Sequence, residues 1–131
     1  YMATRTSSNI WRVNREGQAQ SVIEDSTFRV TEPAYSPDGS RLAYILRKYG
    51  AFGDVYVSDA NGENQTQITR NPGPDSFVTW APDGQSLWYI APVTPKIEVR
   101  KVSFGDGAER TVASLDLVKG QARICLLYTS D

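Results

Sequence analysis

The chain has 131 residues, of which 40% are hydrophobic and 22% charged, and its 14 basic and 15 acidic residues give a formal net charge of −1. This length fits one domain with a packed core, whereas the balanced charge gives no electrostatic basis for binding nucleic acid, and no apolar run approaches the roughly 20 residues that span a bilayer. With no histidine and one cysteine, Cys125, the chain excludes Ser-His-Asp and Cys-His catalysis, histidine zinc sites and an intrachain disulfide, so we expect no cofactor and no metal site.

A hairpin is expected near the start of the chain. Asn9–Asn14 and Gln18–Glu24 predict two short strands, and Gly17 lies in the turn between them. We interpret these strands as the last two of a four-stranded unit, blade one, over residues 8–24.

The next unit, residues 32–69, predicts four strands. Ser36-Pro-Asp-Gly39 suits a hairpin turn, because Pro37 fixes φ at the first central position and Gly39 suits the exit. The strand that follows is apolar on both faces, which indicates that both faces are covered. The expected strands are Glu32–Ser36, Arg41–Arg47, Asp54–Asp59 and Gln65–Thr69.

The third unit, residues 77–114, repeats the second at an offset of 45 residues. "YSPDGSRLAYI" at Tyr35–Ile45 returns as "WAPDGQSLWYI" at Trp80–Ile90, and the same offset aligns Gly17 with Gly62 and Gly62 with Gly107. Further strands are expected near Ile97–Phe104 and Glu109–Ser114, but no third Ser-Pro-Asp-Gly follows.

Four strands in each unit of about 45 residues, with both sheet faces apolar, are typical of β-propeller blades. No segment shows a convincing 3.6-residue apolar period, so we predict an all-β fold with almost no helix. The aromatic residue before each turn, Tyr35 or Trp80, is expected to pack between neighbouring blades. The count is about two and a half blades against the about 4–8 of closed rings. We therefore interpret residues 1–131 as a single incomplete propeller domain.

The repeat resembles a known family. The phrases "AYSPDGSRLAYI", "DVYVSDANGENQTQIT" and "TWAPDGQSLWYI" are similar to the WD-like β-propeller repeat of TolB-type proteins, over about residues 8–114. The same repeat builds the N-terminal propellers of prolyl oligopeptidase-family peptidases. The resemblance implies the propeller fold and a bacterial, periplasmic or otherwise extracytoplasmic setting, but such blades serve many functions.

Residues 115–131 form an irregular tail in this interpretation. Its last part, "CLLYTSD" at Cys125–Asp131, resembles the translation of a transposase adapter used in sequencing libraries, and it is then read-through without biological meaning. The alternative is an ordinary apolar strand, the first of a fourth blade.

The repeated carboxylates are interpreted as turn residues. Asp38 and Asp83 occupy the same place in successive units, and a catalytic pair is built once whereas a turn is needed in every blade. Asp59–Glu63 lacks the Gly and Glu spacing of a calcium loop. Asn64 matches the N-glycosylation pattern, but it is explained by a polar turn.

The binding candidates lie in the connections that do not repeat. Second-to-third and blade-to-blade connections share one face of a propeller, and here they are Lys48–Gly53, Arg70–Ser76 and Pro92–Lys96. Loops on rigid scaffolds often carry function, and Tyr and Arg are enriched at interface hot spots. The candidates are Arg47, Lys48, Tyr49, Phe52, Arg70, Asn71, Asp75 and Lys96.

Three functions remain open at this point. The first is a non-catalytic scaffold that binds a protein or peptide. The second is a substrate-gating propeller segment of a prolyl oligopeptidase-like serine peptidase whose catalytic domain lies elsewhere, since this chain has no Gly-x-Ser-x-Gly. The third is the sensory propeller of a membrane-bound regulator. The open blade edges are also expected to favour self-association.

Overall fold

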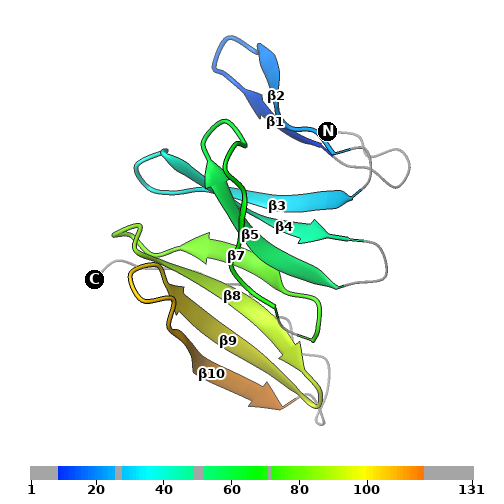
Figure 1. Cartoon of the computed structure of the whole chain (residues 1–131), viewed down its shortest axis with the longest axis vertical. Coiled ribbons are helices and arrows are strands. Elements are labelled where there is room, and N and C mark those ends of the chain that lie inside the picture. The colour runs from blue at the N-terminus through cyan, green and yellow to red at the C-terminus, as the bar shows by residue number, and fades with distance from the viewer. Residues whose placement is uncertain (1–8, 26–27, 49–51, 71, 117–131) are drawn as a thin grey trace.

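The computed structural model describes residues 9–25, 28–48, 52–70 and 72–116 (Figure 1). These residues form ten β-strands and no helix, which confirms the predicted all-β class. The described segments accordingly offer no helix that could span a membrane. The strands are β1 (Ile10–Val13), β2 (Ala19–Ile23), β3 (Arg29–Tyr35), β4 (Arg41–Arg47), β5 (Gly53–Asp59), β6 (Thr66–Gln67), β7 (Ser76–Trp80), β8 (Ser86–Val93), β9 (Lys96–Ser103) and β10 (Glu109–Asp116).

The strands form three antiparallel sheets in which chain neighbours are also sheet neighbours. The orders are β1-β2, β3-β4-β5-β6 and β7-β8-β9-β10. Figure 1 shows the sheets stacked face to face, with β1-β2 at one end and the β7–β10 sheet at the other. This is a partial β-propeller of two four-stranded blades preceded by a two-stranded one.

The middle sheet buries both of its faces, as the sequence of β4 predicts. Leu42 and Tyr44 pack with Ile10 and Ile23 of the first sheet. Ala43 and Ile45 point the other way and pack with Leu87, Tyr89 and other residues of the third sheet. Alternate residues of one strand therefore belong to two different hydrophobic cores.

The two repeated turns share their backbone conformation as well as their sequence. Gly39 and Gly84 have φ of 74° and 69°, and their N–H groups donate to Ser36 and Ala81 at 2.9 Å in both turns. These distances and angles confirm the predicted Ser-Pro-Asp-Gly turn and its counterpart 45 residues later.

The innermost strand of each full sheet starts earlier than predicted. β3 begins at Arg29 rather than Glu32, and it continues through a bulge between Thr31 and Ala34 in which Glu32 has a φ of 55°. Pro33 suggested that the strand starts near it. A bulge also tolerates a proline, because the residue at a bulge does not have to donate an N–H to the neighbouring strand. β7 repeats the device, with a φ of 54° at Phe77.

The fourth strand of the middle sheet is shorter than the expected Gln65–Thr69. Only Thr66 and Gln67 pair with β5. The N–H of Ile68 still donates to Val55 O at 2.8 Å, but Thr69 turns its hydroxyl toward the N–H of Val55, at 2.9 Å. A side-chain hydrogen bond replaces the ladder at this point.

One of the two aromatic residues before the turns packs between blades as expected. Trp80 is buried and donates from Nε1 to Ala34 O at 2.8 Å, and the Arg41 guanidinium lies 5.0 Å from its ring centroid. The same guanidinium donates to Gly84 O at 2.6 Å. A cation–π contact and a hydrogen bond thus join the second and third sheets.

The expectation for Tyr35 is wrong. Its side chain is 40% exposed, and its hydroxyl donates to Ala60 O of the same sheet at 3.2 Å. The reason is that the described part of the first sheet holds only β1 and β2, which match β5 and β6 by the 45-residue offset. No described inner strand lies on the side of β3 where Tyr35 would be covered.

The equivalent glycines Gly17 and Gly62 provide a matched test of sheet stacking. Both have left-handed φ, of 84° and 86°, but a Cβ on Gly17 would meet nothing within 4 Å whereas one on Gly62 would lie 2.2 Å from Val22 O. We expect Gly17→Ala to cost about 1 kcal/mol of unfolding free energy from the backbone alone. Gly62→Ala should cost about 1–3 kcal/mol more, because the first sheet must move.

Urea unfolding midpoints of the two variants measure this difference. Equal losses of stability would show that β1-β2 does not press against the Gly62 turn.

Candidate functional site

Three connections gather at one end of the stacked sheets, which we call the loop face. They are the β4–β5 connection, of which Lys48 and Phe52 are described, the β6–β7 connection (68–75), described except for residue 71, and the β8–β9 connection (94–95). The N–H of Asp75 donates to Gly53 O at 2.9 Å, and a Cβ on Gly73 would lie 2.8 Å from Pro92 O. Backbone contacts therefore hold the β6–β7 connection to the start of β5 and press it against the end of β8.

A buried polar node anchors the middle of this face. Asp75 is only 4% exposed, and its carboxylate accepts a hydrogen bond from the Thr69 hydroxyl. The same hydroxyl oxygen accepts the Val55 N–H at 2.9 Å. Because buried polar groups are costly unless they are bonded, this node fixes where the β6–β7 connection leaves the sheet.

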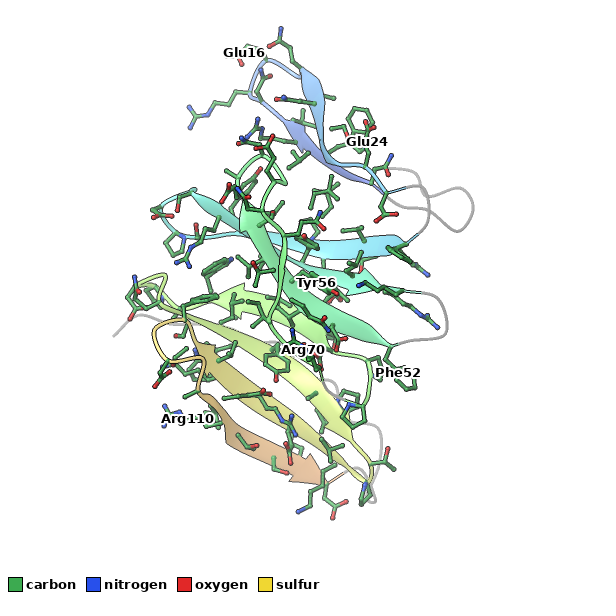
Figure 2. All side chains as sticks on the ribbon, viewed as in Figure 1. Glu16, Glu24, Phe52, Tyr56, Arg70 and Arg110 are labelled. Carbon is green, nitrogen blue, oxygen red and sulfur yellow. The ribbon has the colours of Figure 1, made fainter. Side chains whose placement is uncertain are left out.

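The node places two candidate side chains on the surface. Phe52 directly precedes Gly53 and is 53% exposed, and Arg70 directly follows Thr69 and is exposed. Figure 2 shows Phe52 at the start of β5 and Arg70 on the connection that follows β6. A large apolar group and a cation thus project from backbone that is fixed beneath them.

The end of β4 adds two further cations. Arg47 is exposed and pairs with Gly53 across the β4–β5 ladder. The Lys48 ammonium lies 5.8 Å from the Phe28 ring centroid and 5.7 Å from that of Tyr56. These aromatic faces restrain the ammonium group electrostatically.

The remaining candidates are placed differently. Lys96 is exposed but belongs to the third sheet, where it pairs with Val93. Asp75 points inward, so its own role in the structure is to hold the loop. Tyr49 and Asn71 lie outside the described residues, as does the tail at 117–131. The structure therefore places Arg47, Lys48 and Phe52 around the β4–β5 connection, Arg70 directly after the node, Asp75 within the node and Lys96 on the third sheet.

Two surface residues of this region escaped the sequence interpretation. Arg29 is exposed and pairs with Arg47 across β3 and β4, and Phe77 is 52% exposed at the bulge of β7. Arg29 was missed because the strand was expected to start at Glu32. Phe77 was detectable, since the 45-residue offset aligns it with exposed Glu32 instead of a core residue.

The Ser36–Gly39 turn is unsuited to proton transfer. The Asp38 carboxylate accepts hydrogen bonds from Ser40 N at 3.0 Å and from the hydroxyls of Ser36 and Ser40, each at 2.7 Å. These bonds, that from the Ser40 backbone foremost, lower the pKa of Asp38 to about 2. The group therefore stays ionised at neutral pH and has no proton to donate.

The turn after β5 likewise shows the geometry of a turn. The N–H of Gly62 donates to Asp59 O at 3.0 Å, and the Asn64 amide donates to the Asp59 carboxylate at 2.7 Å. Within the described segments, no three or more His, Cys, Asp or Glu side chains are grouped so that they could hold a metal ion.

Comparison with protein families gives one match across nearly the whole chain. The model of the TolB β-propeller domain matches residues 1–125. Among curated relatives, a "Tol-Pal system protein TolB" from Escherichia fergusonii is 36% identical over 115 residues, which are 85% of this chain and 27% of the relative. The "Uncharacterized peptidase YuxL" of Bacillus subtilis is 31% identical over 80 residues, 61% of this chain and 12% of that protein.

A solved structure shows the same fold. The crystal structure of TolB from Acinetobacter baumannii superposes with a TM-score of 0.68 at 19% identity, covering 80% of this chain and 26% of that one. The chain thus spans between about an eighth and about a quarter of the length of these proteins.

The node itself can be tested by removing one hydroxyl. Thr69→Val keeps the shape of the side chain but leaves the Asp75 carboxylate and the Val55 N–H without this partner, so we expect a loss of about 2–3 kcal/mol of unfolding free energy. Urea unfolding measures it, and Thr66→Val on exposed β6 is the matched control.

A double-mutant cycle with Asp75→Asn should show a coupling of at least about 0.5 kcal/mol. Additive effects of the two substitutions would mean that Thr69 and Asp75 stabilise the loop separately.

Proposed function

Because the chain belongs to the TolB β-propeller domain family, we propose that it is a non-catalytic propeller segment that binds a protein or peptide through the loop face. The observation that carries the proposal is that the exposed Phe52 and Arg70 directly adjoin Gly53 and Thr69, whose positions the Thr69–Asp75 node and the Asp75–Gly53 bond fix. The similar protein from Escherichia fergusonii is named for a Tol-Pal system, which supports a protein as the partner.

The physical case rests on preorganisation. Binding costs less conformational entropy when the contact side chains leave a backbone that is already fixed. Arginine and aromatic side chains are also the types that most often dominate interface energies. The β5 and β7 ends beneath this face are held by the Asp75 N–H to Gly53 O bond, at 2.9 Å, so the surface does not have to form on contact.

The cellular setting is part of the same proposal. The sheets of this chain would occupy part of a ring, and we propose that the remaining blades belong to a longer bacterial protein with an extracytoplasmic propeller. The chain covers only 27% of the Escherichia fergusonii relative, which supports a longer protein of this kind.

A second candidate function is supported by one relative. The similarity to the peptidase YuxL favours a propeller that controls substrate access to a separate catalytic domain. In that case the histidine-free chain would contribute only selectivity. The gene of the longer protein distinguishes the two: a Gly-x-Ser-x-Gly element in a further domain favours the peptidase, and a ring without it favours the scaffold.

The binding proposal predicts a defined effect of two substitutions. Random peptides displayed on phage would be selected on the immobilised whole chain, and single selected peptides would then be titrated. We expect Phe52→Ala combined with Arg70→Ala to weaken their binding at least about tenfold, because hot-spot truncations cost more than about 1.4 kcal/mol.

Val13→Ala with Arg15→Ala is the control, since it removes one exposed apolar side chain and one arginine around the β1–β2 turn. Peptides that bind both double variants as well as the original chain would place the contact elsewhere and refute a loop-face site.

The absence of catalysis is a separate prediction. The whole chain should not hydrolyse fluorogenic peptides or esters, because its repeated carboxylates sit in turns and it holds no histidine. Turnover that persists through repeated purification and disappears with a point substitution in this chain would overturn the assignment.

A further inference from the structure

An aspartate or asparagine stands directly before a glycine at several turns of the chain. Such a step can react with itself, because glycine has no Cβ and its backbone nitrogen is open to approach the side-chain carbonyl carbon of the residue before it. An asparagine is the better target at neutral pH, since its amide carries no negative charge. The steps are Asp38-Gly39, Asn61-Gly62, Asp83-Gly84 and Asp106-Gly107.

The side chain at the Asn61-Gly62 step is free, whereas the other three are held. Each of the three aspartates accepts a hydrogen bond from the backbone N–H two residues further on, which fixes its side chain over the turn. Asn61 is exposed, and its amide makes no hydrogen bond to any described residue. The three bonds run from Ser40 N to Asp38 at 3.0 Å, from Gln85 N to Asp83 at 2.9 Å and from Ala108 N to Asp106 at 2.9 Å.

We propose that Asn61-Gly62 is a site of spontaneous deamidation. The backbone nitrogen of Gly62 forms a bond to Cγ of Asn61, and the side-chain nitrogen leaves as ammonia with the proton that Gly62 gives up. The product is a cyclic succinimide. Water then adds to one of its two carbonyl carbons and opens the ring. The result is aspartate or, where the main chain now runs through the side chain, isoaspartate.

The turn controls how fast this happens. The N–H of Gly62 donates to Asp59 O at 3.0 Å, so the turn must open before the nitrogen can attack. That opening is local, because residues 63–66 are exposed and β5 and β6 share only two paired positions beyond the turn. We therefore expect the reaction to be slower than in an unfolded chain but not to require unfolding of the sheet.

The modified turn should loosen the first sheet. A Cβ on Gly62 would lie 2.2 Å from Val22 O and 3.0 Å from Cγ1 of Ile23, so the two backbones already touch. Figure 1 shows the β5–β6 turn reaching toward β2. Isoaspartate adds one methylene to the main chain directly before Gly62, where there is no room for it. Ile23 belongs to the core between the first two sheets, and this core should therefore open more easily.

A matched variant tests the role of the free side chain. Asp83→Asn creates a second Asn-Gly step in a turn where Gly84 N–H also donates, to Ala81 O at 2.9 Å, and where Gln85 N–H still holds the side-chain oxygen. The whole chain is aged at mildly alkaline pH, and both positions are followed by mass spectrometry of its peptides. We expect position 83 to react at least about threefold more slowly than position 61, because one hydrogen bond lowers the unbonded population by at least about that factor.

Unfolding supplies the reference for these rates. In urea both turns are lost, so the two positions should react at similar rates, each faster than in the folded chain. Asn61→Gln should stay unmodified through the same ageing, because its longer side chain would have to close a larger ring. Circular dichroism verifies that each variant is folded before ageing.

Hydrogen exchange tests the structural consequence. In chains that carry isoaspartate at position 61, the paired amides of β1 and β2 should exchange at least about threefold faster, and those of β8 and β9 should not change. Asn61→Asp is the control, since it adds the charge without the extra methylene, and it should exchange like the original chain.

Three outcomes overturn the inference. The first is an intact Asn61 in the folded chain under conditions in which the urea-unfolded chain reacts. The second is equal reaction at positions 61 and 83 of the folded variant, which would leave no role for the free side chain. The third is unchanged exchange of β1 and β2 in the isoaspartate form. The turn follows the end of β5 opposite to Gly53, so none of these results depends on peptide binding at the loop face.

Discussion

The structure depends on a sheet that is apolar on both faces. β4 cannot be stable with water on either side, because Leu42 and Tyr44 need one cover and Ala43 and Ile45 need another. Sheets with this property must stack, and stacked twisted sheets that repeat in sequence curve around an axis. The hydrogen bond from Trp80 to Ala34 O and the contacts of Arg41 fix the relative position of the second and third sheets, because hydrogen bonds are directional whereas apolar packing is not.

The same constraint explains where sequence reasoning succeeds. Alternation along β4 and the Gly39 and Gly84 turns are local patterns, and both predicted the structure correctly. The predicted strand boundaries were wrong where the regular hydrogen-bond ladder between two strands is interrupted. The bulge at Glu32 and the inward hydroxyl of Thr69 each moved a strand boundary, and neither follows from propensity. Tyr35 was misplaced because its cover depends on strands that the described chain does not contain.

The sequence predicted where the candidate site lies better than it predicted what each of its residues does. Connections that do not repeat indicated the loop face, and the Asp75–Gly53 bond ties the β6–β7 connection to the start of β5 there. The sequence could not show that Asp75 is buried and serves the loop, since aspartate is usually exposed. Nor could it show that Arg29 borders this face, because the register that pairs it with Arg47 depends on the bulge in β3.

The bulges of β3 and β7 also make the blades unequal. The Glu32 carboxylate accepts the N–H of Phe77 at 3.0 Å, so each residue contacts its own counterpart in the next repeat. Phe77 has no carboxylate with which to extend this link to a following blade. The innermost strands are therefore joined by an interaction that one repeat can make and the next cannot. The two full blades of this chain are therefore not interchangeable modules, and a ring assembled from copies of the third sheet would lose this inner hydrogen bond at every junction.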